Sequence, residues 1–302
     1  MGKKIAICVG QNDYDPRTGV TPLRGCVNDA LLIGEMLKLA GFDIIRQIHN
    51  EAATQEGILS RLSAEVAKLR DGDHLVFWNS SHGYQVQDRN GDELVDGLDE
   101  AICSYDTDPR DPLIDDKFGN ILSRIHPGAF VFFGSDSCHS ATLSRAMQKM
   151  QSSNGSNNKA VPRLWTPPDD VFFRSGKPTL DIGNYAKGLK GKGISAPRKM
   201  SKSRRFGFRQ TEKSDNYLLL SGCKADEQSW DTEFPQGNHG VMTYHFAMTV
   251  LEAWSAKKSI SYQVAYRSAI ARIAKAKYNF TQNPQLEGSA SFKQRLVFDH
   301  KP

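Results

Sequence analysis

The chain has 302 residues, 39% of them hydrophobic, and a formal net charge of +5. A chain of this size can bury one large core, and no segment approaches the roughly 20 consecutive apolar residues of a membrane-spanning helix. No signal-peptide pattern opens the sequence, and its five cysteines are scattered, with no zinc-ligand spacing among them. We therefore expect a soluble cytoplasmic protein with reduced thiols and no structural zinc.

Strand-like and helical runs alternate through the first half of the chain. In order, we expect a strand at 4–9, a helix at 27–40, a strand at 42–48, a helix at 54–69, a strand at 74–80, a short strand at 101–104, a helix at 115–125 and a buried strand at 129–134. This alternation predicts an α/β sandwich with a mostly parallel central sheet flanked by helices.

The composition changes after about residue 150, by the criteria for turns and low-complexity segments. Residues 151–215 are first rich in Ser, Asn and Gly, then in Pro, and residues 187–209 hold nine Lys or Arg and no acidic residue. We predict a flexible basic linker at 151–215 between a large block, 1–150, and a small block, 216–302. The small block is expected to hold a strand near 217–220, helices at 241–254 and 259–276 and a strand at 295–298. Because it has too few strands for a sheet of its own, it should extend the first sheet.

Two buried strands of the large block end in residues that can carry chemistry. The run at 74–80 continues into Ser81, His82 and Gly83, and the run at 129–134 leads to Asp136, Ser137 and Cys138. Open parallel sheets place their sites at the carboxyl ends of the strands. An imidazole there can take the thiol proton, and the amides of Gly83 and Cys138 can stabilise an oxyanion. The alternative is that Cys138 is an ordinary buried cysteine.

Short sequence pieces carry a family resemblance. They are 23–29, 81–83, 99–102, 114–116, 136–140, 221–224, 240–244 and 283–286. In this order the chain resembles the metacaspases, including the prokaryotic orthocaspases, among the caspase-like cysteine peptidases. The resemblance covers about nine tenths of the chain. It implies a caspase-like three-layer sandwich and a cysteine endopeptidase with a His82/Cys138 dyad. His82 lies 56 residues before Cys138, close to the spacing of about 50 found in caspases.

The resemblance also implies a preference for substrates with a basic residue before the cut. Asp29 and Asp136 match the acids that hold the Arg or Lys side chain, and Cys26 and Ser80 match walls of that pocket. We expect Arg to be preferred over Lys, since the planar guanidinium suits carboxylates better than an ammonium does. The alternatives are that Asp29 caps a helix and that Asp136 only ends a strand.

No cofactor is needed for this chemistry, but calcium is a candidate activator. Asp99, Asp115 and Asp116 match three calcium ligands of the resembled family, and carboxylate oxygens suit Ca²⁺. The fourth acidic ligand is missing, because Arg145 stands near its position. The alternative is a solvated acidic loop, with Asp115 capping the helix that follows.

The resemblance further implies a zymogen that is cut in its linker after a basic residue, by itself or by an upstream protease. The processing candidates are Arg198, Lys199, Arg204 and Arg205. A basic linker could also occupy the acidic pocket as a tethered inhibitor, and a solvated loop is the alternative. We expect protein substrates with exposed Arg or Lys, a monomer, and neither membrane nor nucleic-acid partners. A silent caspase-like adaptor whose basic linker binds nucleic acid or a partner is the competing hypothesis, which the intact His82 and Cys138 disfavour.

Overall fold

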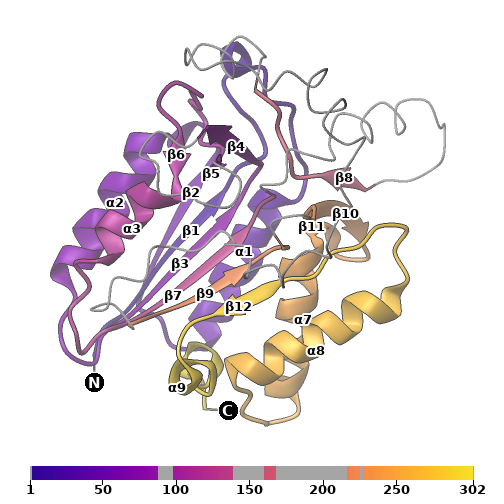
Figure 1. Cartoon of the computed structure of the whole chain (residues 1–302). Helices are drawn as coiled ribbons and strands as arrows, with labels where there is room; N and C mark the ends of the chain where they lie inside the picture. The colour runs from indigo at the N-terminus through magenta and orange to yellow at the C-terminus, as the bar shows by residue number, and fades with distance from the viewer. Residues whose placement is uncertain (1, 88–97, 139–159, 168–215, 225–226, 302) are drawn as a thin grey trace, which may run out of the picture.

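The computed structural model of the protein describes residues 2–87, 98–138, 160–167, 216–224 and 227–301. Its centre is a six-stranded sheet in the order β12-β9-β7-β3-β1-β2 (Figure 1). The strands are β1 (Lys4–Gly10), β2 (Ile44–His49), β3 (His74–Ser80), β7 (Phe130–Asp136), β9 (Tyr217–Ser221) and β12 (Gln285–Glu287). All neighbours run parallel except β12, which is antiparallel to β9. The predicted mostly parallel sheet is confirmed, and β9 and β12 of the small block extend it.

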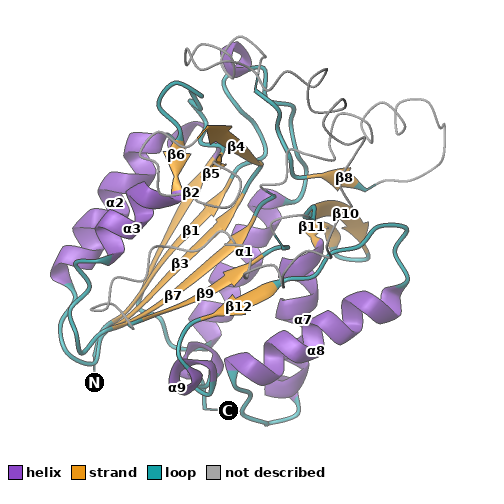
Figure 2. Cartoon of the chain, in the orientation of Figure 1, coloured by secondary structure: helices purple, strands orange, loops and turns teal. Residues whose placement is uncertain are grey.

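Helices cover both faces of this sheet, so the protein has three layers (Figure 2). They are α1 (Cys26–Leu39), α2 (Gln55–Lys68), α3 (Asp115–Leu122), α7 (Val241–Ser255), α8 (Tyr262–Ala276) and α9 (Ala290–Lys293), with 3₁₀ turns at Pro16–Thr18, Asn50–Ala52 and Val297–Asp299. Alternation along β3 explains the two faces: Val76 and Trp78 pack towards α1 and α7, whereas Leu75 and Phe77 pack towards α2 and α3. In the part of the chain that the structure describes, no helix is long and apolar enough to cross a membrane.

Two small antiparallel sheets lie at the carboxyl ends of the central strands (Figure 2). One contains β4 (Gly83–Gln87), β5 (Leu98–Ile102) and β6 (Leu113–Ile114), and the other contains β8 (Val161–Pro162), β10 (Trp230–Phe234) and β11 (Gly237–Gly240). β8 belongs to the predicted linker, of which the structure describes residues 160–167. The processing candidates Arg198, Lys199, Arg204 and Arg205 lie outside the described residues.

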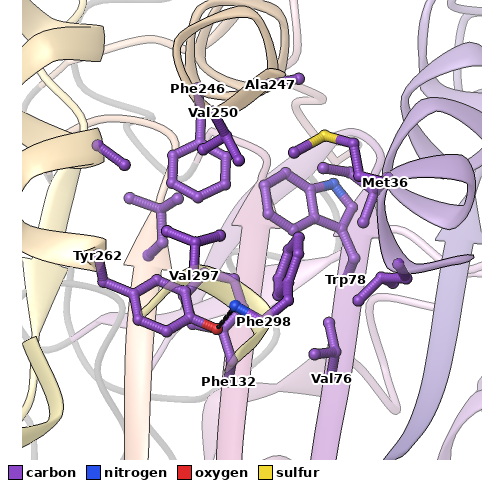
Figure 3. Packing of buried hydrophobic residues seen from close by; sticks show 14 of the residues in the cluster. Met36, Val76, Trp78, Phe132, Phe246, Ala247, Val250, Tyr262, Val297 and Phe298 are labelled. Carbon is purple, nitrogen blue, oxygen red and sulfur yellow. Dashed lines mark hydrogen bonds between the residues drawn. The ribbon is translucent and has the colours of Figure 1, made fainter. Parts of the chain in front are cut away.

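The larger apolar core shows why the predicted C-terminal strand at 295–298 is wrong. Phe298 lies beside Phe132 and Tyr262 (Figure 3), and its ring also contacts that of Trp254. Its backbone N–H donates to the Tyr262 hydroxyl at 3.2 Å. Its φ of 54° is incompatible with a strand, and the segment forms a 3₁₀ turn instead. The apolar residues at this end therefore pack into the core and do not form an edge strand.

Candidate active site

The register of the two central strands brings His82 and Cys138 to the same place. β3 and β7 are parallel neighbours, and Ser80 lies opposite Asp136 in their pairing. His82 and Cys138 each follow two residues later, so both leave the carboxyl edge of the sheet at the same level. Both side chains are buried.

His82 is held in the tautomer that a general base requires. Its Nε2 lies 2.9 Å from the backbone carbonyl oxygen of Thr21, which can only accept a hydrogen bond, so Nε2 carries the proton. Nδ1 has no hydrogen-bond partner among the described residues. Burial lowers the pKa of His82 to about 4, so the ring is neutral at pH 7. The sequence did not reveal the group that orients this histidine, because it is a main-chain carbonyl in a loop.

The Cys138 thiol lies beside a second cysteine. Its Sγ donates to the carbonyl oxygen of Glu227 at 3.2 Å, and the Cys223 thiol contacts the same oxygen at 3.4 Å. The hydrogen bond with Cys138, followed by burial, raises the pKa of Cys223 well above its ordinary value. None of the five cysteines forms a disulfide in the described structure, and all five are buried.

The acidic pocket beside this pair contains an arginine of the chain itself. Arg163, just after β8, is fully buried. Its Nη2 donates to Asp29 Oδ2 at 2.7 Å, and its Nη1 donates to Ser80 Oγ at 2.6 Å and to the Asp136 carbonyl oxygen at 2.9 Å. The Cys26 thiol is hydrogen-bonded to Ser80 and interacts electrostatically with the guanidinium. The four residues that the resemblance assigned to a basic-residue pocket are thus brought together around one guanidinium.

Asp29 makes the direct charged contact. Its Oδ2 also accepts from Ser80, and its Oδ1 accepts from the Gly240 amide at 3.1 Å and lies 3.0 Å from Nδ1 of His239. The alternative that Asp29 caps a helix is wrong, because the N-cap of α1 is Gly25 and no side chain caps that end of the helix.

Asp136 has a second task besides binding the guanidinium. Its Oδ2 accepts from both the amide and the hydroxyl of Thr243, at 2.9 and 2.7 Å, and so caps the N-terminus of α7. The same oxygen is 3.4 Å from Nη1 of Arg163. Asp136 therefore ties the end of β7, the arginine and the small-block helix α7 together, which is more than ending a strand.

Asp231 on β10 is a third carboxylate near the guanidinium that sequence reasoning missed. Its Oδ1 lies 3.7 Å from Nη2 of Arg163, and its Oδ2 accepts from the amides of Arg24 and Gly25. Burial alone would lower the pKa of Arg163, but the surrounding Cys26 and carboxylates raise it well above its ordinary value. The pocket therefore holds a cation.

Gly240 shapes the pocket by lacking a side chain. A Cβ at this position would lie 2.2 Å from Asp136 Oδ2 and 2.4 Å from Nη1 of Arg163. Any larger residue would occupy the space of the guanidinium. Residues 240–244 contribute to the family resemblance of the sequence, but nothing in them indicates this role of Gly240.

The main chain of Arg163 is held as firmly as its side chain. Its carbonyl oxygen accepts from the amide of Gly83 at 3.0 Å and from the amide of Cys138 at 3.3 Å, and its own amide donates to Ser229 O at 2.9 Å. The preceding β8 pairs with β10, with Val161 opposite Asp231. The two amides expected to stabilise an oxyanion thus both donate to the carbonyl oxygen of the pocket-bound arginine itself.

The three candidate calcium ligands lie at one corner of the small β4–β5–β6 sheet. Asp99 is on β5, and Asp115 and Asp116 open α3, whose N-cap is Ile114 without a side-chain cap. Capping by Asp115 is therefore wrong. Among the described residues, no group of three or more His, Cys, Asp or Glu is arranged to hold a metal ion. Activation by calcium stays a prediction.

Comparison with known proteins gives the family of the chain. The sequence model of one protein family, described as "Caspase domain", matches residues 3–295. The chain belongs to this caspase-domain family. It is 30% identical over 310 residues to Metacaspase-1 of Cryptococcus neoformans var. neoformans serotype D, covering 98% of this chain and 65% of that relative. It is 36% identical over 154 residues to Metacaspase-3 of Arabidopsis thaliana, covering 47% and 41% of the two chains.

A solved structure shares the fold of this caspase-domain protein. The crystal structure of protein GSU0716 from Geobacter sulfurreducens matches with a TM-score of 0.64 and 25% identity, covering 99% of this chain and 100% of that one. The resemblance to metacaspases and the caspase-like fold are confirmed. The chain spans slightly less than two thirds of the Cryptococcus relative, 65% of its length.

Proposed function

We propose that this caspase-domain protein is a cysteine endopeptidase that cuts protein chains after arginine and, less efficiently, after lysine. One observation carries the proposal. The chain's own Arg163 lies in the acidic pocket, and its carbonyl oxygen lies between the amides of Gly83 and Cys138. That is the position expected of the residue before a scissile bond.

The residues around this carbonyl can perform the reaction in two steps. Nδ1 of His82 takes the proton of the Cys138 thiol, and Sγ leaves its hydrogen bond to Glu227 and bonds to the carbonyl carbon. The oxyanion is stabilised by the two amides. The C–N bond then breaks, and the leaving amine receives the proton from His82.

The resulting thioester is hydrolysed by water. His82 takes a proton from the water as its oxygen bonds to the acyl carbon, and the C–S bond breaks. The proton returns from His82 to the sulfur, which regenerates the thiol, and the product carboxylic acid then loses its own proton to solvent to give a carboxylate. No cofactor takes part in these steps.

The preference for arginine rests on the fork of the guanidinium. On one side of the fork Nη2 donates to Asp29, and on the other side Nη1 donates to Ser80 and to the Asp136 carbonyl oxygen. A lysine carries a single nitrogen on a shorter side chain and can satisfy only one side. The pocket therefore selects arginine by geometry as well as by charge.

We further propose that the protein is a zymogen that cuts itself between Arg163 and Leu164. While this segment occupies the pocket, other substrates are excluded, and the tether keeps its local concentration high. Arg198, Lys199, Arg204 and Arg205 stay predicted processing sites for this or an upstream protease. The same proposal includes a cytoplasmic location and a monomeric state. It also includes activation by calcium, and substrates that are proteins with exposed Arg or Lys.

A peptide assay tests this function. Purified protein, with and without calcium, is given coumarin peptides that end in Val-Pro-Arg, Val-Pro-Lys or Val-Pro-Asp, beside the Cys138→Ala variant. We expect hydrolysis in the order Arg, Lys, and no hydrolysis after Asp, all lost in the variant. Hydrolysis after Asp, or equal rates with Cys138→Ala, would contradict the proposal.

A further inference from the structure

The two residues that follow Arg163 are also buried. Leu164 is 4% exposed and Trp165 is 7% exposed. They enter two separate apolar clusters, one at the thiols and one at the β4–β5 sheet. The chain is therefore bound through buried side chains on both sides of the Arg163 carbonyl.

Leu164 packs beside the thiol of Cys138. It packs with Cys138 and Cys223 in a small cluster of buried apolar side chains, and its backbone forms a parallel bridge with Gly83. An aliphatic side chain in this place fills the space beside the two sulfurs. A glycine there would leave that space empty or filled with water.

Trp165 fills a pocket formed by two separate parts of the chain. Its ring meets the ring of Tyr84 edge to face, with centroids 5.1 Å apart and an interplanar angle of 77°. The apolar residues that cluster with it come from the loop after β1 and from β4, β5 and the turn that follows, and they are Tyr14, Val20, Tyr84, Val86, Ala101 and Cys103.

This pocket is joined to the catalytic histidine. The Tyr14 hydroxyl, in its wall, accepts the backbone N–H of His82 at 2.9 Å. Gly83 contacts the backbone of both Arg163 and Trp165. Its amide donates to the Arg163 carbonyl at 3.0 Å, and its own carbonyl accepts from the Trp165 amide at 2.9 Å. The pocket, the oxyanion donor and the base thus share one rigid stretch of backbone.

We propose that these two sites are specificity subsites for the residues after the scissile bond, the first for an aliphatic and the second for an aromatic side chain. The preferred substrate is a protein segment of the form Arg-aliphatic-aromatic, of which Arg163-Leu164-Trp165 is the chain's own example. The inference rests on the proposed function and deepens it. Burying an aliphatic and an aromatic side chain favours binding, and a rigid pocket adds little ordering cost.

Internally quenched peptides test the inference with the wild-type chain. Four peptides share Ala-Val-Pro-Arg and continue with Leu-Trp-Thr, Leu-Ala-Thr, Gly-Trp-Thr or Gly-Ala-Thr, and the cut bond is identified by mass spectrometry. We expect kcat/KM to fall at least about tenfold when Trp becomes Ala, and by a similar factor when Leu becomes Gly.

A pair of matched variants assigns the aromatic preference to its pocket. In Tyr84→Leu the ratio of kcat/KM between the Leu-Trp and Leu-Ala peptides falls towards one. The same substitution at Tyr278, which stacks on Phe280 beside β10 on the other side of the site, leaves that ratio unchanged. Because a ratio is compared, a general loss of activity in either variant does not affect the reading.

The outcomes separate this inference from the proposed function. Equal kcat/KM for all four peptides, each cut after Arg, would overturn the two subsites and leave the arginine-specific activity standing. A Trp preference that survives in Tyr84→Leu would overturn the assignment of the pocket. Failure to cut any peptide would overturn both proposals.

Discussion

Replacing Asp29 by Asn should remove most of the activity towards arginine peptides. Asp29 makes the shortest charged contact to the guanidinium, 2.7 Å to Nη2. The side chain is fully buried and accepts from Ser80 and Gly240 as well. An asparagine keeps the shape but turns an amide N–H₂ towards one set of these donors. Truncating one partner of a buried, hydrogen-bonded charge pair costs about 2–5 kcal/mol.

We take about 3 kcal/mol for this substitution, because Asp136 and Asp231 remain within 3.4 and 3.7 Å of the guanidinium. At 1.36 kcal/mol per factor of ten, kcat/KM for a Val-Pro-Arg-coumarin peptide should fall roughly 100-fold or more. Asp231→Asn is the matched control. Its carboxylate lies farther away, 3.7 Å from Nη2, and makes no hydrogen bond to the guanidinium, so we expect a loss below about tenfold.

The comparison requires samples in the same processing state, established by the mass of their fragments, and an unchanged circular dichroism spectrum. A well-folded Asp29→Asn protein that cleaves the Arg peptide within threefold of wild type would refute the assigned role of Asp29. So would a larger loss in Asp231→Asn than in Asp29→Asn.

Three further predictions concern the pocket, the base and the core. Gly240→Ala should abolish Arg-peptide hydrolysis while the protein stays folded by circular dichroism, because the added Cβ takes the space of the guanidinium; retained activity would contradict the pocket geometry. Because burial lowers the pKa of His82 to about 4 from about 6.5 in the unfolded chain, its contribution to stability is full above pH 6.5 and is lost as the pH falls to 4. Urea unfolding of Cys138→Ala should therefore show about 3 kcal/mol less stability at pH 4 than at pH 7 from this group, and His82→Gln in that background should flatten the pH dependence; an unchanged slope would contradict a buried neutral ring. Phe298→Ala should lower the free energy of unfolding by about 3–5 kcal/mol in the same assay, because its side chain is buried in the core. A loss below about 1 kcal/mol would contradict this packing of the C-terminal turn.

The parts of the fold that could be predicted are those that local pattern determines. The apolar runs of β3 and β7 are continuous because both faces of the central sheet are covered, and their common direction places His82 and Cys138 together. The run at 295–298 is equally apolar, but packing against Tyr262 and Phe132 decides its conformation. Tertiary contacts of this kind leave no periodic signal in the sequence.

The acidic pocket was reached only through family resemblance, and its remaining members were missed for identifiable reasons. Asp231 lies about two hundred residues from Asp29 in the chain, so no local spacing connects them. The orienting group of His82 is the carbonyl of Thr21, which carries no side-chain signal. Arg163 lies in a proline-rich part of the linker, whereas the more basic residues 187–209 carry the stronger sequence signal for a processing site.

The most direct test of the account is the amino-terminal sequence of the fragments that the purified chain produces on incubation. We expect a fragment that begins with Leu164-Trp165-Thr166-Pro167 and that is absent from the Cys138→Ala protein. Identical fragments from wild type and Cys138→Ala, or Cys138-dependent fragments that begin after a residue other than Arg or Lys, would contradict the claim that Cys138 cuts after a basic residue held by Asp29.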